Sequence, residues 1–390
     1  MTSESDRIAK YKSHTHREHI YKICDTYIGS TECHTELSWK VDNEKMTQKN
    51  LSYIPGLYKI VDELVVNAWD QFIRCRDNKT SKVTFINIEV HPETGVVSVT
   101  NDGKGIDILI HPEHKIYTVE MIFGKLLTST NYTEGEERIT GGKNGYGAKL
   151  ANIFSKWFEV ETVDLNTKKK YYQKFTDNMT KIEKPVITEK YNSKEFTRIS
   201  FLPDFERFNI KGWTTDMMDI FHRRAYELAA ACGGSVKVNF NDTMIPIRRF
   251  KEFCGMFFEN SDSIISETVG TRWEVAIGVS DEFKSVSFVN GVNTSKGGKH
   301  VDYVVQSICK RMVDIIQKKE KITVKASYIK EHMFILVNSI IVNPSFDSQT
   351  KDYLTTPIAK FGSKCELSDK FYDALVKLGI IEKVVETYQF

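Results

Sequence analysis

The chain has 390 residues, which at roughly 100–200 residues per domain corresponds to two or three compact units and excludes a single small module. Hydrophobic residues make up 41% and charged residues 27%, which excludes a disordered chain, and a formal charge of only +2 excludes a protein that coats nucleic acid along its whole length. No run approaches the roughly 20 apolar residues of a membrane helix, and the N-terminus lacks an apolar signal core, so we expect an intracellular protein without a membrane partner.

In chain order, the first predicted element is a helix over residues 57–74, where apolar side chains recur at the helical period after Pro55-Gly56. Strands follow at 83–90 and 96–100, joined by a turn-forming segment. Residues 128–147 are too polar and too rich in glycine to pack as an element, and helical spacing resumes over 148–157. The sequence therefore predicts a long loop that opens a helix.

The rest of the chain alternates strands and helices in two groups. Strands are expected at 157–163, 170–175, 196–202 and 235–240, with a helix at 214–231. Beyond residue 248 the pattern restarts, with strands at 272–279, 285–289 and 332–342 and helices at 299–317 and 367–378. We expect an α+β sandwich followed by a second domain, with the boundary near residue 248.

The cysteines and the N-terminal histidines suggest no special chemistry. The seven cysteines are odd in number and none forms a C-x-x-C pair, which argues against a disulfide framework or a zinc site. His14, His16 and His19 have no nearby cysteine or carboxylate at ligand spacing, so a solvated polar face is favoured over a metal site.

On the predicted helix 57–74, Glu63, Asn67 and Asp70 are spaced so that all three project from one face. A carboxylate can act as a general base on water, and an amide oxygen can bind Mg²⁺. The alternative is an ordinary solvated helix face. Asn67 weakens that alternative, because asparagine is a poor helix former that needs a reason to lie in the middle of a helix.

Two glycine-containing motifs also indicate ligand contact. Residues 101–106 (NDGKGI) directly follow a strand, where two glycines allow a tight turn and a close approach to a ligand; a plain turn is the alternative. Residues 141–149 (GGKNGYGAK) lead into a helix, whose free N–H groups can bind phosphate. The second motif is neither a P-loop, which needs K-[ST] after its last glycine, nor a G-x-G-x-x-G dinucleotide fingerprint.

Taken together, DTYIGS, IPGLYK, DELVVNAWD, NDGKGI, LLTSTNY, GGKNGYGAK, SFVNGVNTSKGGKHVDYV and FDSQTK occur in an order that resembles the GHKL ATPase superfamily, specifically the ATPase region of eukaryotic-type (type IIA) DNA topoisomerase II. The resemblance implies a GHKL-type sandwich over residues 31–248 and a transducer domain of ribosomal-protein-like βαβ fold over 249–390. It also implies an N-terminal strap over residues 1–30, which lie outside the first domain's core pattern. Gln71 and Trp69 depart from the family, which usually has asparagine and a small residue there.

The resemblance also implies the site residues. Glu63 would be the general base, Asn67 the Mg²⁺ ligand, and Gln349 and Lys351 a QTK loop that places its lysine on the γ-phosphate. The implied ATP-binding residues are Tyr27 of the strap, Asn67, Asp70, Asn101, Gly105, Ser129, Thr130, Asn131, Gly142, Lys143, Asn144, Gly145, Tyr146, Gly147, Ala148, Lys149 and Thr197.

The function implied is an Mg²⁺-dependent ATPase that closes a homodimer on ATP binding and drives passage of one DNA duplex through another. The cleavage residues would lie elsewhere in a longer polypeptide, which would act in the nucleus or, for a viral protein, inside the host cell. A nucleotide-gated dimerisation clamp with little turnover is the alternative. For DNA contact we expect Lys318, Lys319 and Lys321, in a charged loop after the 299–317 helix, with a solvated loop tip as the alternative.

Overall fold

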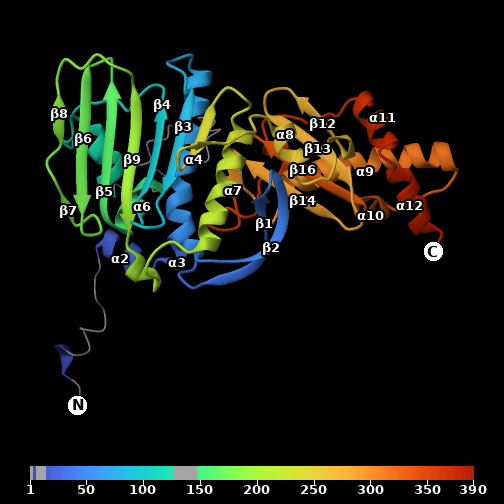
Figure 1. Cartoon of the computed structure of the whole chain (residues 1–390), viewed down its shortest axis with the longest axis horizontal. Helices are drawn as coiled ribbons and strands as arrows, with labels where there is room; N and C mark the ends of the chain where they lie inside the picture. The colour runs from blue at the N-terminus through green and yellow to red at the C-terminus, as the bar shows by residue number, and fades with distance from the viewer. Residues whose placement is uncertain (1–2, 6–14, 127–146) are drawn as a thin grey trace.

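The computed structural model describes residues 3–5, 15–126 and 147–390. Figure 1 shows two β-sheets side by side along the long axis of the molecule, with the helices α4 and α7 between them. Strands and helices follow one another without the regular β-α-β alternation of a parallel sheet, which confirms the predicted α+β class.

The first sheet is mixed and runs in the order β11-β10-β3-β4-β9-β5-β6-β7, with β8 also paired to β6. The pairing of β10 with β3 is parallel, and the others in this path are antiparallel. Its strands are β3 (Phe85–Val90), β4 (Val97–Asp102), β5 (Ser155–Asp164), β6 (Lys169–Thr176), β7 (Lys181–Ile182), β8 (Val186–Thr188), β9 (Phe196–Pro203), β10 (Lys237–Phe240) and β11 (Thr243–Met244). All strands predicted here are confirmed, with ends shifted by one or two residues.

One face of this sheet is covered by α4 (Pro55–Asp77), α6 (Gly147–Ile153) and α7 (Thr215–Ala231), with α5 (Thr118–Gly124) beside α6. Alternate residues of β3 are buried on that face (Ile86, Ile88 and Val90), as expected for a sheet with one solvated side. Pro55 stands in the first turn of α4, where its missing N–H costs no hydrogen bond. The predicted helix over 57–74 is confirmed and extends to Asp77.

The second sheet has the order β12-β13-β16-β14-β15 and pairs β14 with β16 in parallel. Its strands are β12 (Ile264–Val269), β13 (Trp273–Val279), β14 (Lys284–Val289), β15 (Val292–Asn293) and β16 (Met333–Ser339). The accompanying helices are α8 (Phe250–Gly255), α9 (Lys299–Glu320), α10 (Ala326–Lys330), α11 (Asp369–Lys377) and α12 (Ile380–Tyr388). The strands and helices predicted for this part are confirmed, whereas β12, β15, α8, α10 and α12 were not predicted.

Both faces of β16 are buried, each in a different core. Met333, Ile335 and Val337 join the core under α9, α11 and α12, whereas Phe334 and Leu336 join the core of the first sheet. A strand that is covered on both faces has a continuous run of hydrophobic residues, as in residues 333–337 (MFILV) here. The first core thus extends onto the second sheet, and the domain boundary near residue 248 stays a prediction.

A hairpin of β1 (His34–Asp42) and β2 (Lys45–Tyr53), which the sequence did not reveal, bridges the two sheets. Its turn residues Asn43 and Glu44 both have positive φ, as a type I′ turn requires, but Glu44 replaces the glycine that usually signals this turn. The hairpin packs on α7 and places Trp39 edge-on against Phe257, with ring centroids 4.8 Å apart.

The described part of the N-terminal segment forms α2 (His16–Lys22) and α3 (Asp25–Ile28). Ile20, Cys24 and Ile28 are fully or almost fully buried in the first core. The expectation that residues 1–30 lie outside that core is therefore wrong for this stretch. The burial was not predicted because this segment is mostly polar and too short to show a clear helical pattern of apolar residues.

Two further expectations need correction. The helix predicted over 148–157 ends at Ile153, because Phe158 and Val160 are buried alternately in β5 and strand pairing prevails over helical spacing. The loop expected at Lys318 and Lys319 is the last turn of α9, which ends with Lys321 in the left-handed conformation at its C-cap. Cations on this turn interact favourably with the C-terminal end of the helix dipole.

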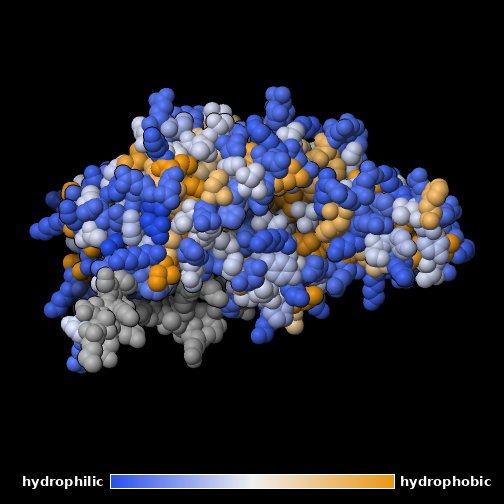
Figure 2. All heavy atoms as spheres, turned by 90° about the horizontal axis from the view of Figure 1, so that it is seen from below, coloured by the Kyte–Doolittle hydropathy of each residue, from blue (hydrophilic) through white to orange (hydrophobic). Residues whose placement is uncertain are grey.

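On the face seen in Figure 2, hydrophilic side chains predominate and hydrophobic ones gather only in small groups. Among the described residues, none of the helices is both long enough and apolar enough to cross a membrane.

The two sheets are joined by a buried ion pair. Arg224 of α7, only 1% exposed, donates to Asp62 of α4 at 2.5 Å and to the main-chain oxygen of Gly291, in the β14–β15 turn, at 2.6 Å. Gly291 has a φ of +77° and lies against the indole of Trp69, which a Cβ at this position would approach to 2.7 Å. Arg224 therefore contacts both helices and the second sheet at once.

Replacing Arg224 with methionine should destabilise the protein by about 3–5 kcal/mol, because Asp62 would be left buried without its partner. Thermal and urea denaturation measure the loss. The matched control is Arg311→Met, which removes an exposed ion pair with Asp369 and should leave the unfolding midpoint unchanged. Equal midpoints for both variants would contradict the structural role of Arg224.

Candidate active site

Glu63 is buried in the middle of α4, with only 3% of its surface exposed. Lys59, one turn earlier and also buried, places its ammonium nitrogen 2.8 Å from Glu63 Oε1. Asp70 is 1% exposed, and Asn67 is half-buried. The alternative of a solvated helix face is therefore wrong for this set.

The second cation near Glu63 comes from a loop that follows the second sheet. Lys351 lies in the loop after β16, is 6% exposed and acts electrostatically on Glu63. Burial raises the pKa of the Glu63 carboxyl, but Lys59 and Lys351 together lower it below its ordinary value. Burial also lowers the pKa of the Lys351 ammonium; Glu63 and Asp70 oppose this effect, and Lys59 adds to it.

The loop that carries Lys351 is fixed at both ends. Its main chain is bridged by Phe346 and Leu354, and Leu354 also pairs with Gly298 before α9. Lys351 adopts a φ of +59°, a left-handed conformation that non-glycine residues seldom take. Gln349 of the same loop is exposed. The structure therefore brings Lys351, but not Gln349, into the buried cluster.

Gly147 begins α6 and packs directly on the Glu63 carboxylate. A Cβ at this position would lie 2.1 Å from Glu63 Oε2. Ala148 and Lys149 follow as buried residues, and burial lowers the pKa of the Lys149 ammonium. The remaining glycine-motif and ribose–phosphate residues of the prediction, Ser129, Thr130, Asn131, Gly142, Lys143, Asn144, Gly145 and Tyr146, lie outside the described residues.

The predicted adenine side is built on three adjacent strands. Asn101 of β4 stands opposite Thr197 of β9, which stands opposite Thr162 of β5. The hydroxyls of Thr162 and Thr197 lie 2.9 Å apart. Gly105 approaches this row so closely that a Cβ would lie 1.8 Å from the main-chain oxygen of Val163, a space that only glycine can occupy.

Gln71 and Trp69, the two residues that differ from the pattern expected in the sequence analysis, both take part in packing. Gln71 donates to the main-chain oxygen of Lys104 at 2.6 Å, in the turn that carries Gly105. Trp69 donates from its indole nitrogen to the main-chain oxygen of Ala231 at 3.2 Å. These contacts join α4 to the glycine turn and to α7.

The N-terminal segment contacts the same region. Tyr27 is half-buried, and its hydroxyl lies 3.1 Å from Nδ1 of His19 in the same chain. Gly29, with a φ of +93°, lies against Thr350; a Cβ there would come within 2.9 Å of the threonine methyl group. The segment is therefore packed against the loop that carries Lys351.

The lysines predicted to contact DNA lie away from Glu63. Lys318, Lys319 and Lys321 are exposed at the C-terminal end of α9, remote from α4 (Figure 1).

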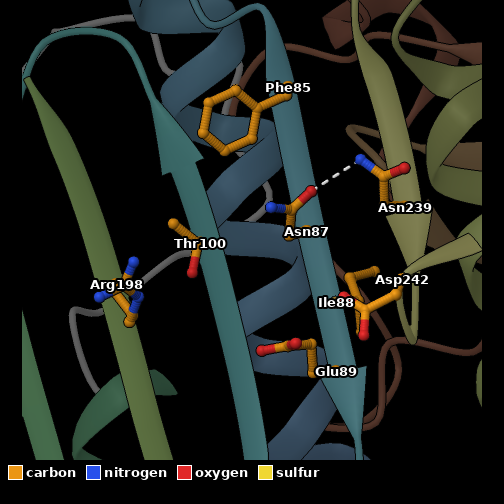
Figure 3. Close-up of a pocket in the computed structure, with 8 residues that line it drawn as sticks. All are labelled: Phe85, Asn87, Ile88, Glu89, Thr100, Arg198, Asn239 and Asp242. Carbon is orange, nitrogen blue, oxygen red and sulfur yellow. Dashed lines mark hydrogen bonds between the residues drawn. The ribbon is translucent and has the colours of Figure 1, made fainter. Parts of the chain in front are cut away.

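A hollow of about 400 Å³ lies on the face of the first sheet opposite the covering helices (Figure 3), so that α4 is seen behind the strands. It is lined by Phe85, Asn87, Ile88, Glu89, Thr100, Arg198, Asn239 and Asp242.

Sequence reasoning overlooked Lys59, Thr162 and Glu195, whose carboxylate accepts a hydrogen bond from the Gly105 N–H at 2.9 Å. The signal for Lys59 was available, because it precedes Glu63 by one helical turn within IPGLYK. Thr162 in β5 and Glu195 directly before β9 had no such signal, because the pairing of β5 with β9 brings them to the site.

The fold and this arrangement define a class of ATPase. Residues 53–198 match the family of histidine kinase-, DNA gyrase B-, and HSP90-like ATPases, and residues 239–390 match the DNA gyrase B family.

Relatives identify the branch of this class. The chain is 43% identical to DNA topoisomerase 2 of Bombyx mori, over 97% of this chain and 25% of that protein. It resembles the crystal structure of the ATPase region of Saccharomyces cerevisiae topoisomerase II with a TM-score of 0.90 and 41% identity, over 98% of this chain and 99% of that one. The ATPase and transducer domains of Balamuthia mandrillaris topoisomerase II match with a TM-score of 0.90 and 37% identity, over 98% of each chain.

The chain therefore belongs to the family of type II DNA topoisomerase ATPase regions, as the sequence motifs predicted. It spans about a quarter of the length of the curated relative from Bombyx mori.

Replacing Gly147 with alanine should displace the Glu63 carboxylate and lower ATP turnover by about 100-fold, the cost of misplacing a catalytic group by about 1 Å. Steady-state ATPase assays measure the effect. The control is Gly212→Ala, where a Cβ meets nothing within 4 Å and turnover should stay at the wild-type level. A Gly147→Ala variant as active as this control would show that the close packing has no bearing on Glu63.

Proposed function

We propose that this chain hydrolyses ATP at the site around Glu63 and uses the nucleotide state to drive a type II topoisomerase reaction. The observation that carries the proposal is the buried carboxylate of Glu63, kept ionised by Lys59 and Lys351. A buried, ionised carboxylate beside a glycine-rich segment suits a general base that takes a proton from water. Membership of the ATPase family supports this assignment.

Among the described residues, no group of three or more His, Cys, Asp and Glu side chains is placed to hold a metal ion. Mg²⁺ is commonly bound by one or two protein oxygens together with waters and substrate phosphates. The half-buried amide of Asn67, one turn after Glu63, fits that requirement. We therefore propose Asn67 as the Mg²⁺ ligand. The ion would supply positive charge at the phosphate oxygens.

The remaining residues divide into two groups. Asn101, Gly105, Thr197 and Asp70 would bind the adenine end, and the 129–131 and 142–149 segments the ribose and phosphates. Lys351 would place its ammonium on the γ-phosphate, with Gln349 in the same loop. Because Lys351 lies in the loop that follows β16 of the second sheet, this contact would link the presence of the γ-phosphate to the arrangement of the two parts.

The larger reaction is proposed from the family. ATP binding would close a homodimer, with the N-terminal strap and Tyr27 reaching the partner, and hydrolysis would drive passage of one DNA duplex through another. The GHKL domain would span 31–248 and the transducer 249–390. The exposed Lys318, Lys319 and Lys321 would contact the passing duplex through phosphates alone. Cleavage would belong to the rest of a longer intracellular polypeptide.

Glu63→Gln should lower ATP turnover by about 100- to 10,000-fold, because the amide cannot accept the proton from water. Binding of a non-hydrolysable ATP analogue should persist, and calorimetry measures it alongside the ATPase assay. Turnover close to wild type would contradict the assignment of Glu63 as the base.

Lys351→Met should lower kcat by about 100- to 1,000-fold, the usual cost of removing one preorganised charge from a transferring group, with a much smaller effect on ATP affinity. The same variant should abolish the difference in X-ray scattering between the ATP-analogue and ADP complexes. The control is Lys360→Met, an exposed lysine of the same part of the chain. If wild-type scattering profiles with the two nucleotides superimpose, Lys351 does not couple the nucleotide to the two parts.

Deleting residues 1–14 should weaken dimerisation with the ATP analogue, measured by light scattering, because the strap would lose its reach to the partner. Truncation must spare Ile20, Cys24 and Ile28, which are buried in the core. Glu63→Gln serves as the control, since it should dimerise without hydrolysis. Unchanged dimerisation in the truncated chain would remove residues 1–14 from the mechanism.

A further inference from the structure

Glu195 is a half-buried carboxylate at the candidate site, and the function proposed above gives it no role. It lies directly before β9 and 90 residues after Gly105 in the chain. Its Oε2 accepts a hydrogen bond from the Gly105 N–H at 2.9 Å. Hydrogen bonds that involve a charged group are about twice as strong as those between neutral groups. Glu195 therefore fixes the glycine turn to the start of β9.

The same peptide unit is held from its other side by α4. The carbonyl oxygen of Lys104 and the N–H of Gly105 belong to one peptide unit, and Gln71 donates to that oxygen at 2.6 Å. Glu195 and Gln71 thus engage both polar groups of a single peptide unit. The N–H has only one hydrogen to donate, and Glu195 accepts it.

Glu195 and the proposed base-binding residues share neighbouring strands. Thr197 follows Glu195 by two residues and stands opposite Asn101 of β4. Thr162 of β5 stands opposite Thr197, and its hydroxyl accepts a hydrogen bond from the Ile106 N–H at 3.0 Å. Two successive N–H groups of the turn therefore bind side chains that the pairing of β5 with β9 brings together.

Glycine at position 105 makes such a restraint necessary. A Cβ there would lie 1.8 Å from the main-chain oxygen of Val163, so close packing on β5 excludes any other residue. Glycine also adopts φ of either sign readily, and the peptide unit before it can rotate so that its N–H and C=O exchange places. Glu195 opposes this rotation, because the carbonyl oxygen would then face its carboxylate.

We propose that Glu195 is a positioning residue for the base of the nucleotide: by binding the Gly105 N–H, it keeps this donor away from the purine. The base is then bound by Asn101 and Thr197. This inference rests on the proposed function, which assigns the adenine end to these residues. Adenine carries an amino donor at C6, whereas guanine carries an oxygen that accepts hydrogen bonds. A free N–H at Gly105 would favour guanine, so its engagement by Glu195 favours adenine.

The test compares Glu195→Ala with Glu195→Gln in the full chain, using calorimetry with non-hydrolysable ATP and GTP analogues and the ATPase assay. Glu195→Ala should raise the Kd of the ATP analogue and the KM for ATP by about 10-fold, the usual effect of losing a hydrogen bond to a charged group. The kcat should change by less than about threefold. The ratio of the Kd of the GTP analogue to that of the ATP analogue should fall by at least about threefold.

Glu195→Gln should restore most of the affinity for the ATP analogue, because the amide oxygen still accepts the Gly105 N–H. The matched control is Glu189→Ala in the same connection between β8 and β9. It removes a largely exposed ion pair with Lys169 and should leave both Kd values unchanged.

Gln71 provides a second measurement on the same peptide unit. Gln71→Ala releases the carbonyl oxygen of Lys104 and should also weaken binding of the ATP analogue. In the Gln71→Ala, Glu195→Ala double variant the loss should be smaller than the product of the single effects, because either change already releases the peptide unit. Losses that multiply would overturn the proposal, since the two side chains would then act independently.

Asn101→Ala separates this inference from the proposed function. An unchanged Kd of the ATP analogue in Asn101→Ala would overturn the proposed adenine site and the role of Glu195 with it. Weakened binding in Asn101→Ala, beside Kd values in Glu195→Ala within about threefold of wild type, would overturn only the role of Glu195.

The split between KM and kcat decides whether Glu195 acts on the base. A fall in kcat as large as the rise in KM would overturn the proposal, because it would indicate a general disturbance of the site. If Glu195→Ala fails to fold, Glu195→Asp takes its place. Its carboxylate is one carbon further from Gly105, and the same results would support or overturn the proposal.

Discussion

The site depends on one constraint, which is that the carboxylate charge of Glu63 lies inside the protein and must be balanced there. An unpaired buried carboxylate would be too costly to ionise. Lys59 balances it from within α4, and Lys351 does so from a loop of the second sheet. Part of the charge that stabilises the candidate catalytic group as an anion thus comes from the second part of the chain.

Several features of the fold meet this requirement. Arg224 ties Asp62, the residue before Glu63, to the Gly291 turn of the second sheet. The hairpin β1–β2 reaches across from α7 and packs Trp39 on Phe257. The N-terminal segment lies against Thr350, beside Lys351. Three separate segments therefore hold the junction at which Lys351 meets α4, and a change in nucleotide state would have to act against all of them.

Much of this was predictable from the sequence. The hydrophobic periodicity predicted α4, α7, α9 and most strands. The motifs predicted the family and pointed to Glu63 and Lys351 as candidate site residues. The hairpin was missed because Asn43-Glu44 lacks the usual glycine, and the burial of Ile20 and Ile28 was missed because a short polar helix gives a weak pattern. Thr162 and Glu195 depend on the register of distant strands, and Lys59 gains meaning only from its 2.8 Å contact with Glu63.

The most direct test of the central claim is a double-mutant cycle on the free energy of unfolding, with Glu63→Gln, Lys351→Met and the double variant, measured by urea denaturation without nucleotide. If the two buried charges balance each other across the junction, the losses should be non-additive by about 0.5–3 kcal/mol, with the double variant more stable than the sum predicts. Additivity within about 0.3–0.5 kcal/mol would contradict the account, because Glu63 would then not depend on the second sheet.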